Sequence, residues 1–192
     1  MDMKLECKKV VGYVDESGTW IIEPKFDDAY SFNEGFARVE LDGKWGFIKT
    51  DGSYLVEPKF DDAKNFHEGF AGVKLDGKSG FIKTDGTYLV EPKFHGAKDF
   101  HEGFAKVGLN FKWGYIKDDG TFLVEPKFDA AGDFNEGFAR VELDGKWGYI
   151  KTDGTYLVEP QFDDAGDFEN GAAYVELDGE EGELKADGTV TF

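Results

Sequence analysis

The stretch DGKWGFIKTDGSYLVEPKFDDA, residues 42–63, decides the fold, because it returns almost unchanged as DGKWGYIKTDGTYLVEPQFDDA at residues 144–165. Glycine and proline each recur every 34 residues, without insertion or deletion. The glycines are Gly12, Gly46, Gly80, Gly114, Gly148 and Gly182, and the prolines are Pro24, Pro58, Pro92, Pro126 and Pro160. A fixed period of this length is typical of repeat proteins, in which each unit buries its apolar face against its neighbours.

The period predicts a single array of six units in which the terminal units act as caps. The units are residues 2–35, 36–69, 70–103, 104–137, 138–171 and 172–192. The longest stretch of the second unit without glycine or proline is Lys59–Glu68, which is too short for either helix of a helical pair. The remaining segments are β-branched and aromatic and are bounded by Asp-Gly dipeptides, which favour tight turns between strands. The sequence therefore predicts an all-β protein.

We expect each unit to be a meander of three antiparallel strands with a return loop. In the second unit the strands are Phe36–Leu41, Lys44–Lys49 and Tyr54–Glu57, and Pro58 ends the third one. In the return loop, Phe60, Ala63 and Phe66 are spaced three residues apart, which suits one helical or 3₁₀ turn. The second and third strands carry apolar side chains on both faces, so we expect neighbouring units to cover both faces.

The two ends of the chain depart from the repeat. The first unit begins with an expected strand at Met3–Cys7, and it has Val11 where the second unit has Trp45. The last unit has Glu181 at the Trp45 position and Glu183 at the Phe47 position. Polar replacement at the ends is what the caps of an open array need, and it favours a stacked, twisted or superhelical β-array over the alternative, a closed six-bladed propeller-like ring.

The composition is strongly acidic, with a formal net charge of −18 from 22 basic and 40 acidic residues. This balance argues against binding to nucleic acid or to anionic membranes, which need clustered lysine and arginine. Residues 138–171 carry eight acids against three basic residues, and residues 172–192 carry six against one. An acidic end favours a basic protein partner through electrostatic attraction, and plain solubility is the other interpretation of the charge.

Cys7 is the only cysteine, so the chain forms no intramolecular disulfide and no cysteine-based metal cage. The N-terminal residues lack the apolar core of a signal peptide, and no segment has 18 consecutive apolar residues, so membrane insertion is not expected. We expect a soluble monomer, with a cytoplasmic location favoured.

The repeated motif Gly-Lys-Trp-Gly-(Phe/Tyr)-Ile-Lys, followed by an Asp-Gly turn and Glu-Pro-Lys-Phe-Asp, resembles the WG-repeat (KWG) family of bacterial β-repeat proteins. The Trp-Gly pair occurs at Trp45-Gly46, Trp113-Gly114 and Trp147-Gly148. Tryptophan is replaced at Val11, Ser79 and Glu181, whereas the glycine that follows is always retained. The resemblance covers essentially the whole chain. It implies a β-rich repeat protein, commonly bacterial, for which protein interaction is the usual presumption, and it assigns no functional residue.

Several motifs of the sequence resemble sites of chemistry. Gly72–Ser79 matches the phosphate-binding pattern G-x-x-x-x-G-K-S, but we expect a strand, a turn and a strand there, whereas that loop must lead into a helix. His67 and His101 occupy equivalent positions, which suggests a polar loop position, with a metal pair as the alternative. The acidic pairs, such as Asp61-Asp62, are explained by turn formation, and calcium binding between units is the alternative.

No asymmetric pair of carboxylates, nucleophile motif or cofactor motif is present, so we expect a non-enzymatic protein without a cofactor. The first functional hypothesis is a scaffold that presents a repetitive surface to a protein partner, and the candidate contacts are Arg38, Glu40, Arg140 and Glu142. An inhibitor that turns its acidic end against a basic effector is a refinement of it. The alternatives are a carbohydrate-binding or surface-attachment module that uses an exposed ladder of Trp45, Trp113 and Trp147, and a structural spacer.

Overall fold

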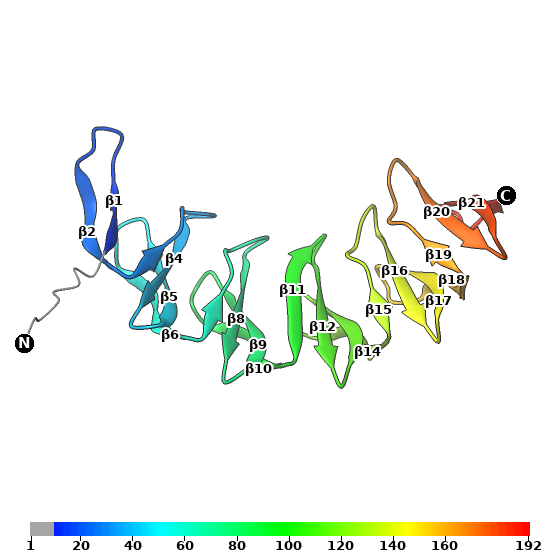
Figure 1. The fold of residues 1–192 in the computed structure, drawn as a ribbon, viewed down its shortest axis with the longest axis horizontal. Coiled ribbons are helices and arrows are strands. Elements are labelled where there is room, and N and C mark those ends of the chain that lie inside the picture. Colours follow the sequence, from blue (N-terminus) through cyan, green and yellow to red (C-terminus); the bar gives the residue numbers. More distant parts are fainter. Residues whose placement is uncertain (1–9) are drawn as a thin grey trace, which may run out of the picture. The chain divides into compact units, whose positions relative to one another are not determined.

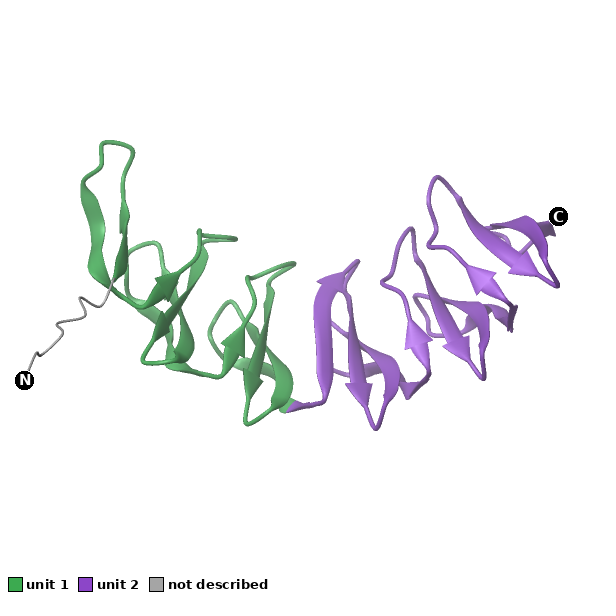
Figure 2. Cartoon of the chain, viewed as in Figure 1, with its two compact units in different colours: residues 1–92 green, residues 93–192 purple. Residues whose placement is uncertain are grey.

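The computed structural model describes residues 10–192, and these residues form strands, turns and bends without a helix (Figure 1). The chain divides into two compact units, Met1–Pro92 and Lys93–Phe192 (Figure 2). The all-β fold predicted from the repeat is confirmed. The strand expected at Met3–Cys7 lies outside the described residues, and the arrangement of all six repeats as one open array stays a prediction.

The strands of unit 1 are β1 (Val11–Val14), β2 (Trp20–Phe26), β3 (Asp28–Ala29), β4 (Phe36–Leu41), β5 (Lys44–Lys49), β6 (Tyr54–Phe60), β7 (Asp62–Ala63), β8 (Phe70–Leu75), β9 (Lys78–Lys83) and β10 (Tyr88–Phe94), within which unit 1 ends. The strands of unit 2 are β11 (Gly96–His101), β12 (Phe104–Leu109), β13 (Lys112–Lys117), β14 (Phe122–Phe128), β15 (Ala130–Ala131), β16 (Phe138–Leu143), β17 (Lys146–Lys151), β18 (Tyr156–Phe162), β19 (Asp164–Ala165), β20 (Ala172–Leu177), β21 (Glu180–Lys185) and β22 (Val190–Thr191).

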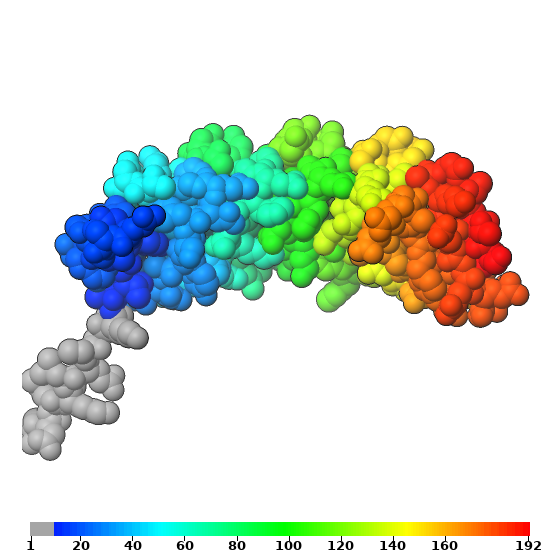
Figure 3. Space-filling model, turned by 90° about the horizontal axis from the view of Figure 1, so that it is seen from above, coloured from blue at the N-terminus to red at the C-terminus, as the bar shows by residue number. Residues whose placement is uncertain are grey.

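These strands form separate antiparallel sheets, and no sheet in the described part of the chain closes into a barrel. In unit 1 the strand orders are β1-β2, β3-β4-β5-β6 and β7-β8-β9-β10. In unit 2 they are β11-β12-β13-β14, β15-β16-β17-β18 and β19-β20-β21-β22. In Figure 3, the surface of unit 2 follows the chain order, from green to red.

The predicted meander is confirmed, and its first turn has the expected chemistry. Strands β4 and β5 pair in the register Glu40↔Trp45 and Leu41↔Lys44. Asp42 and Gly43, which join them, both have positive φ angles, 52° and 75°. This is the left-handed backbone of the tightest hairpin turns, which Asp-Gly adopts readily.

Two predicted details are wrong. The third strand does not end at Pro58, because β6 continues to Phe60. The return segment does not form a helical or 3₁₀ turn, because β7 pairs with β8 through Asp62↔Lys74 and Ala63↔Val73. The N–H of Lys64 also donates to the carbonyl of Gly72 at 2.8 Å. The return segment satisfies its backbone groups on the edge of the next sheet, and it provides the first strand of each four-stranded sheet in the described part of the chain.

The retained glycine of the Trp-Gly pair is explained by a close crossing of two strands. The pairing of β5 with β6 changes register between Trp45 and Phe47, beside Gly46. A Cβ atom on Gly46 would lie 2.6 Å from the carbonyl oxygen of Val56 and 2.6 Å from the nitrogen of Pro58. Any side chain there would overlap the backbone of β6, so glycine is required at this irregularity.

The apolar core lies between successive sheets. In unit 1, one buried cluster joins Phe47 and Phe60 of the sheet β3–β6 to Val73 and Ile82 of the sheet β7–β10. Ile48 packs in the other direction, with Ile22 and Phe26 of β2. Adjacent residues of β5 therefore face opposite neighbours. The prediction that neighbouring repeats cover both faces is confirmed within the unit.

Unit 2 repeats the same arrangement. Tyr115 and Phe128 of the sheet β11–β14 pack with Val141 and Ile150 of the sheet β15–β18. A further cluster joins Tyr149 and Phe162 to Val175 and Leu184 of the last sheet. Within residues 10–192, no helix is long and apolar enough to cross a membrane.

Candidate functional site

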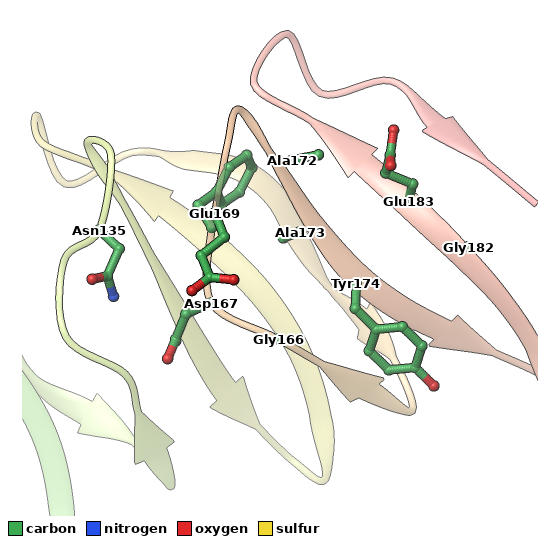
Figure 4. Close-up of a pocket in the computed structure, with 10 residues that line it drawn as sticks. Asn135, Gly166, Asp167, Glu169, Ala172, Ala173, Tyr174, Gly182 and Glu183 are labelled. Carbon is green, nitrogen blue, oxygen red and sulfur yellow. The ribbon is translucent and has the colours of Figure 1, made fainter.

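A groove of about 700 Å³ opens beside the last sheet of unit 2 (Figure 4). Its walls come from β20, from β21 and from the segment 166–169 that precedes β20. The residues that line it are Asn135, Gly166, Asp167, Phe168, Glu169, Ala172, Ala173, Tyr174, Gly182 and Glu183. Phe168 and Ala173 are buried, so its base rests on the core of the unit.

One residue that lines the groove stands where the preceding sheet has a buried aromatic side chain. Tyr149 of β17 is buried by the sheet that follows it. The equivalent residue of the last sheet is Glu183, which is exposed and lies opposite Tyr174 in the pairing of β20 with β21. Tyr174 is 40% exposed. A carboxylate therefore faces solvent where other sheets have a buried aromatic ring, and an exposed phenol ring lies opposite it.

The groove contains two carboxylates that no cation within residues 10–192 balances. Asp167 pairs with Arg140, whose Nε lies 2.9 Å from the Asp167 Oδ1. Glu169 and Glu183 have no ion-pair partner within residues 10–192, and both are exposed. The backbone N–H of Glu169 donates to the carbonyl of Ala172 at 2.8 Å, which fixes the loop that carries this carboxylate. The arrangement suits a ligand that carries lysine or arginine side chains.

The predicted contact residue Arg38 is engaged within unit 1. Its guanidinium carbon lies 3.6 Å from the ring centre of Tyr30 and 5.2 Å from that of Trp45. One of its terminal nitrogens donates to the carbonyl of Ala63 at 2.5 Å, in the edge strand of the next sheet. Arg38 therefore joins two sheets, with its charge over aromatic rings.

Arg140 has the equivalent role in unit 2. It donates to the carbonyl of Ala165 at 2.6 Å, pairs with Asp167, and places its guanidinium carbon 5.1 Å from the ring centre of Trp147. Glu142 is half-buried and lies opposite Trp147.

Glu40 is half-buried and lies opposite Trp45 in the same way. The four predicted contact residues thus divide between the two units, and both arginines hold neighbouring sheets together. Their role toward a partner stays a prediction.

The aromatic ladder is mostly core. The aromatic side chains two residues after the tryptophan position are buried: Phe47, Phe81, Tyr115 and Tyr149. The tryptophans themselves, Trp45, Trp113 and Trp147, are half-buried. These buried rings pack between repeats, as expected from the apolar side chains on both sheet faces. They form no exposed ladder.

The hydroxyls of Tyr115 and Tyr149 bind the edge of the following sheet. Tyr115 donates to the carbonyl of Gly132 at 2.7 Å, and Tyr149 donates to the carbonyl of Gly166 at 2.6 Å. Burial raises the pKa of both phenols far above its ordinary value, and the carboxylate of Asp133 raises that of Tyr115 further. Both side chains therefore remain neutral donors.

The remaining sequence motifs have structural positions. Gly72–Ser79 spans β8, a turn and the start of β9, so the phosphate-loop interpretation is excluded by an antiparallel hairpin. His67 belongs to unit 1 and His101 to unit 2, where its Nε2 lies 4.0 Å from Asp133. No group of three or more histidine, cysteine, aspartate or glutamate residues within the described chain is arranged to hold a metal ion. Calcium binding stays an untested alternative.

Sequence reasoning identified Glu183 as an end replacement but missed the groove that contains it. The signal was present at two further positions. Tyr174 stands where Arg38 and Arg140 stand in their repeats, and Glu169 stands where His67 and His101 stand. Only the fold brings these departures from the repeat to one surface, because they come from a loop, β20 and β21.

Comparison with known proteins places the repeat in a family. A family model described as WG containing repeat matches residues 12–45, 45–78, 80–112, 113–147 and 147–180. A search of curated proteins found no match.

Among solved structures, the chain is similar to Hsv2p of Kluyveromyces lactis, with 14% identity and a TM-score of 0.46 over 86% of this chain and 62% of that chain. It is also similar to the hemopexin fold protein CP4 of cow pea, with 14% identity and a TM-score of 0.26 over 68% of this chain and 88% of that chain. The chain therefore spans less than two thirds of the length of the Hsv2p structure.

Proposed function

The chain belongs to the family of proteins with the WG containing repeat, and we propose that it is a non-enzymatic binding module that presents its repeated surface to a protein partner with clustered basic residues. The groove beside the last sheet supports this proposal most directly. It combines the exposed carboxylates of Glu169 and Glu183 with the exposed ring of Tyr174. Tyrosine is enriched at protein-binding surfaces, and charged groups there select a partner of complementary charge.

The charge of the chain supports the same class of partner. A net charge of −18 attracts basic surfaces and repels acidic ones, and the two C-terminal repeats carry the largest share of it. Since electrostatic attraction mainly accelerates encounter, affinity would come from desolvated contacts in the groove. The proposed interaction therefore has two parts, a long-range attraction and a local fit.

The architecture is consistent with binding rather than catalysis. Several polar side chains of the repeats serve the links between sheets, as Arg140 does with Ala165 and Asp167. A module of this kind offers a rigid surface on which a few departures from the repeat create a specific site. Glu183 and Tyr174 are two such departures.

Affinity capture with three versions of the chain tests this proposal. The groove variant carries Glu169→Gln and Glu183→Gln. The control variant carries Glu125→Gln and Glu159→Gln, which remove the same charge from exposed positions of β14 and β18 in the same unit. Captured proteins are identified by quantitative mass spectrometry, purified and tested for direct binding.

We expect at least one purified partner with clustered lysine or arginine to lose tenfold or more in affinity for the groove variant and to keep its affinity for the control. If a partner binds all three versions equally, the groove is not the contact surface. If no captured protein binds the purified chain directly, the proposed function is wrong.

A further inference from the structure

A second recess, of about 450 Å³, lies in unit 2 beside Trp113 of β13. It differs from the acidic groove because its lining is uncharged apart from Lys112 and His95. Lys112 is paired with Asp129, so its charge is balanced. The recess is centred on the indole ring of Trp113 and bounded by Phe111.

The floor of the recess consists of two glycines in adjacent strands. Gly96 of β11 lies opposite Gly108 of β12, which in turn lies opposite Trp113. A Cβ atom on Gly108 would lie 3.5 Å from the indole ring, and one on Gly96 would lie only 3.2 Å from it. The glycines therefore let the indole lie directly against the sheet as a flat apolar platform.

This arrangement is specific to one repeat. The equivalents of Gly108 are Glu40, Lys74, Glu142 and Glu176. In the last repeat, four equivalent positions hold Asp163, Asp164, Glu176 and Asp178, whereas here they hold His95, Gly96, Gly108 and Asn110. In a chain of net charge −18, none of the residues that line this recess carries a carboxylate, so its lining does not favour a cationic ligand.

The ring of Trp113 also lacks the cation that covers the other repeated tryptophans. Arg38 lies over Trp45, and Arg140 lies over Trp147. The equivalent residue of this repeat is Lys106. Its Nζ lies 3.0 Å from Asp133 and donates to the carbonyl of Ala131 at 3.1 Å. No cation lies over the indole of Trp113 in the described part of the chain, so its face is available to a ligand.

Phe111 completes the recess at a conformational cost. It occupies the position of the turn glycines Gly43 and Gly145, has a φ angle of 63°, and is 100% exposed. A bulky residue with positive φ is strained, and such strain is often found at functional sites. This turn therefore carries an aromatic ring beside the indole of Trp113, whereas the equivalent Asp-Gly turns have glycine at this position.

We propose that this recess binds one pyranose ring of a neutral carbohydrate. The apolar C–H face of a pyranose suits the indole face, and its uncharged edge suits a patch without carboxylates. The hydroxyl groups on that edge would meet the side chains of His95 and Asn110, which can donate and accept hydrogen bonds. An aliphatic or phenyl side chain of a protein would leave these polar groups without partners, which disfavours it.

Two-dimensional NMR of the full chain tests the proposal with cellotetraose, maltotetraose, xylotetraose and N-acetylchitotetraose as probes. The indole N–H signal of Trp113 is assigned with Trp113→Phe. We expect at least one probe to shift that signal in a saturable manner and to leave the signal of Trp147 in place. Polygalacturonate and N-acetyltryptophanamide serve as the charged and the aromatic comparison ligands.

Two variants restore residues that other repeats carry, so both are expected to fold. Gly108→Glu introduces the residue of Glu40 and Glu142, and its Cβ atom fits at ordinary contact distance. Asn110→Asp combined with Phe111→Gly restores the Asp-Gly turn. Each should weaken binding at least fivefold, whereas Glu169→Gln with Glu183→Gln should leave it unchanged.

The proposal is overturned if none of the four probes shifts the Trp113 signal, if only polygalacturonate or N-acetyltryptophanamide shifts it, or if both restoring variants bind as the wild type does. The recess and the acidic groove share no lining residue. Either proposal can therefore fail without the other.

Discussion

Glu136 and Gly171 lie one repeat apart and are directly joined, because a carboxylate oxygen of Glu136 accepts a hydrogen bond from the backbone N–H of Gly171 at 2.7 Å. The other carboxylate oxygen accepts from the N–H of Asn170 at 2.8 Å. Asn170 and Gly171 both have positive φ angles, 55° and 83°, so their N–H groups converge on one point. Successive N–H groups of this kind form a cradle for an anion.

The same link occurs elsewhere in both units. Glu102 accepts from the N–H groups of Glu136 and Gly137 at 2.8 Å each, and Glu34 accepts from the N–H of Gly69 at 2.9 Å. The Glu136-Gly137 dipeptide is thus a donor to the repeat before it and an acceptor for the repeat after it. The 34-residue period of the sequence is the distance that this link spans.

Replacement of Glu136 by alanine should destabilise unit 2. It removes two charge-assisted hydrogen bonds at an exposed position, so we expect a loss of about 1 kcal/mol in the free energy of unfolding. Chemical denaturation followed by circular dichroism measures it. Glu159→Ala, at an exposed strand position without such a link, is the control. Equal destabilisation by both variants would show that the link contributes nothing specific.

Replacement of Gly148 by alanine should be far more damaging. The new Cβ atom would lie 2.6 Å from the carbonyl oxygen of Val158 and 2.6 Å from the nitrogen of Pro160, and both are backbone atoms that cannot move aside alone. We expect a loss of about 3 kcal/mol or more in the free energy of unfolding. Trp147→Ser, which introduces the residue found at position 79, should cost less than Gly148→Ala. The reverse order in thermal melts would contradict this explanation of the retained glycine.

Alkaline pH should weaken the fold through Tyr115. Its pKa is raised by burial and by Asp133, whereas in the unfolded chain it ionises near pH 10. Below about pH 10, the neutral Tyr115 side chain makes its full contribution to the free energy of unfolding. Above pH 10 this contribution is lost progressively, because the unfolded state releases a proton that the folded state retains. The free energy of unfolding should fall by up to about 1.4 kcal/mol per pH unit for this one side chain.

Tyr115→Phe tests the alkaline effect, because phenylalanine is the natural residue at the equivalent positions Phe47 and Phe81. The variant loses the hydrogen bond to Gly132, so we expect it to cost about 1 kcal/mol near neutral pH. Above pH 10 its stability should fall less steeply than that of the wild type. Parallel pH profiles would rule out Tyr115 as a source of the effect.

Replacement of Arg140 by lysine separates its structural role from a role in binding. Lysine is found at the equivalent position 106, but it cannot keep both the hydrogen bond to Ala165 and the stacking on Trp147. We expect a loss of about 1 kcal/mol in the free energy of unfolding. Glu142→Gln should leave stability nearly unchanged. A partner whose affinity falls with Glu142→Gln would place the predicted contact surface on this face of the sheet.

Much of the secondary structure could be predicted because it depends on local chemistry. The Asp-Gly turns require positive φ angles, which the dipeptide adopts readily, and the β-branched and aromatic segments between them form strands as expected. The extension of β6 through Pro58 and the short strand β7 were missed. Both depend on hydrogen bonds to backbone groups elsewhere in the sheet. The sequence of one segment does not show which groups those are.

For the candidate site residues, too, the tertiary contacts could not be predicted from the local sequence. The sequence predicts Arg38 and Arg140 as contacts with a protein partner. The structure instead places each guanidinium against the next sheet, at the carbonyls of Ala63 and Ala165. A side chain of this length reaches beyond its own strand, so its destination is set by the neighbouring sheet.

The sequence by itself determined the period, the strands, the tight turns and the burial of both sheet faces, because each of these follows from spacing and local backbone preference. The tertiary structure decided where the carboxylates go: Glu136 into the cradle of the next repeat, Asp167 to Arg140, and Glu183 into an open groove. These residues have the same chemistry in the sequence. What separates them is the presence or absence of donors within a few ångströms, and only the packing of one sheet on another brings those donors there.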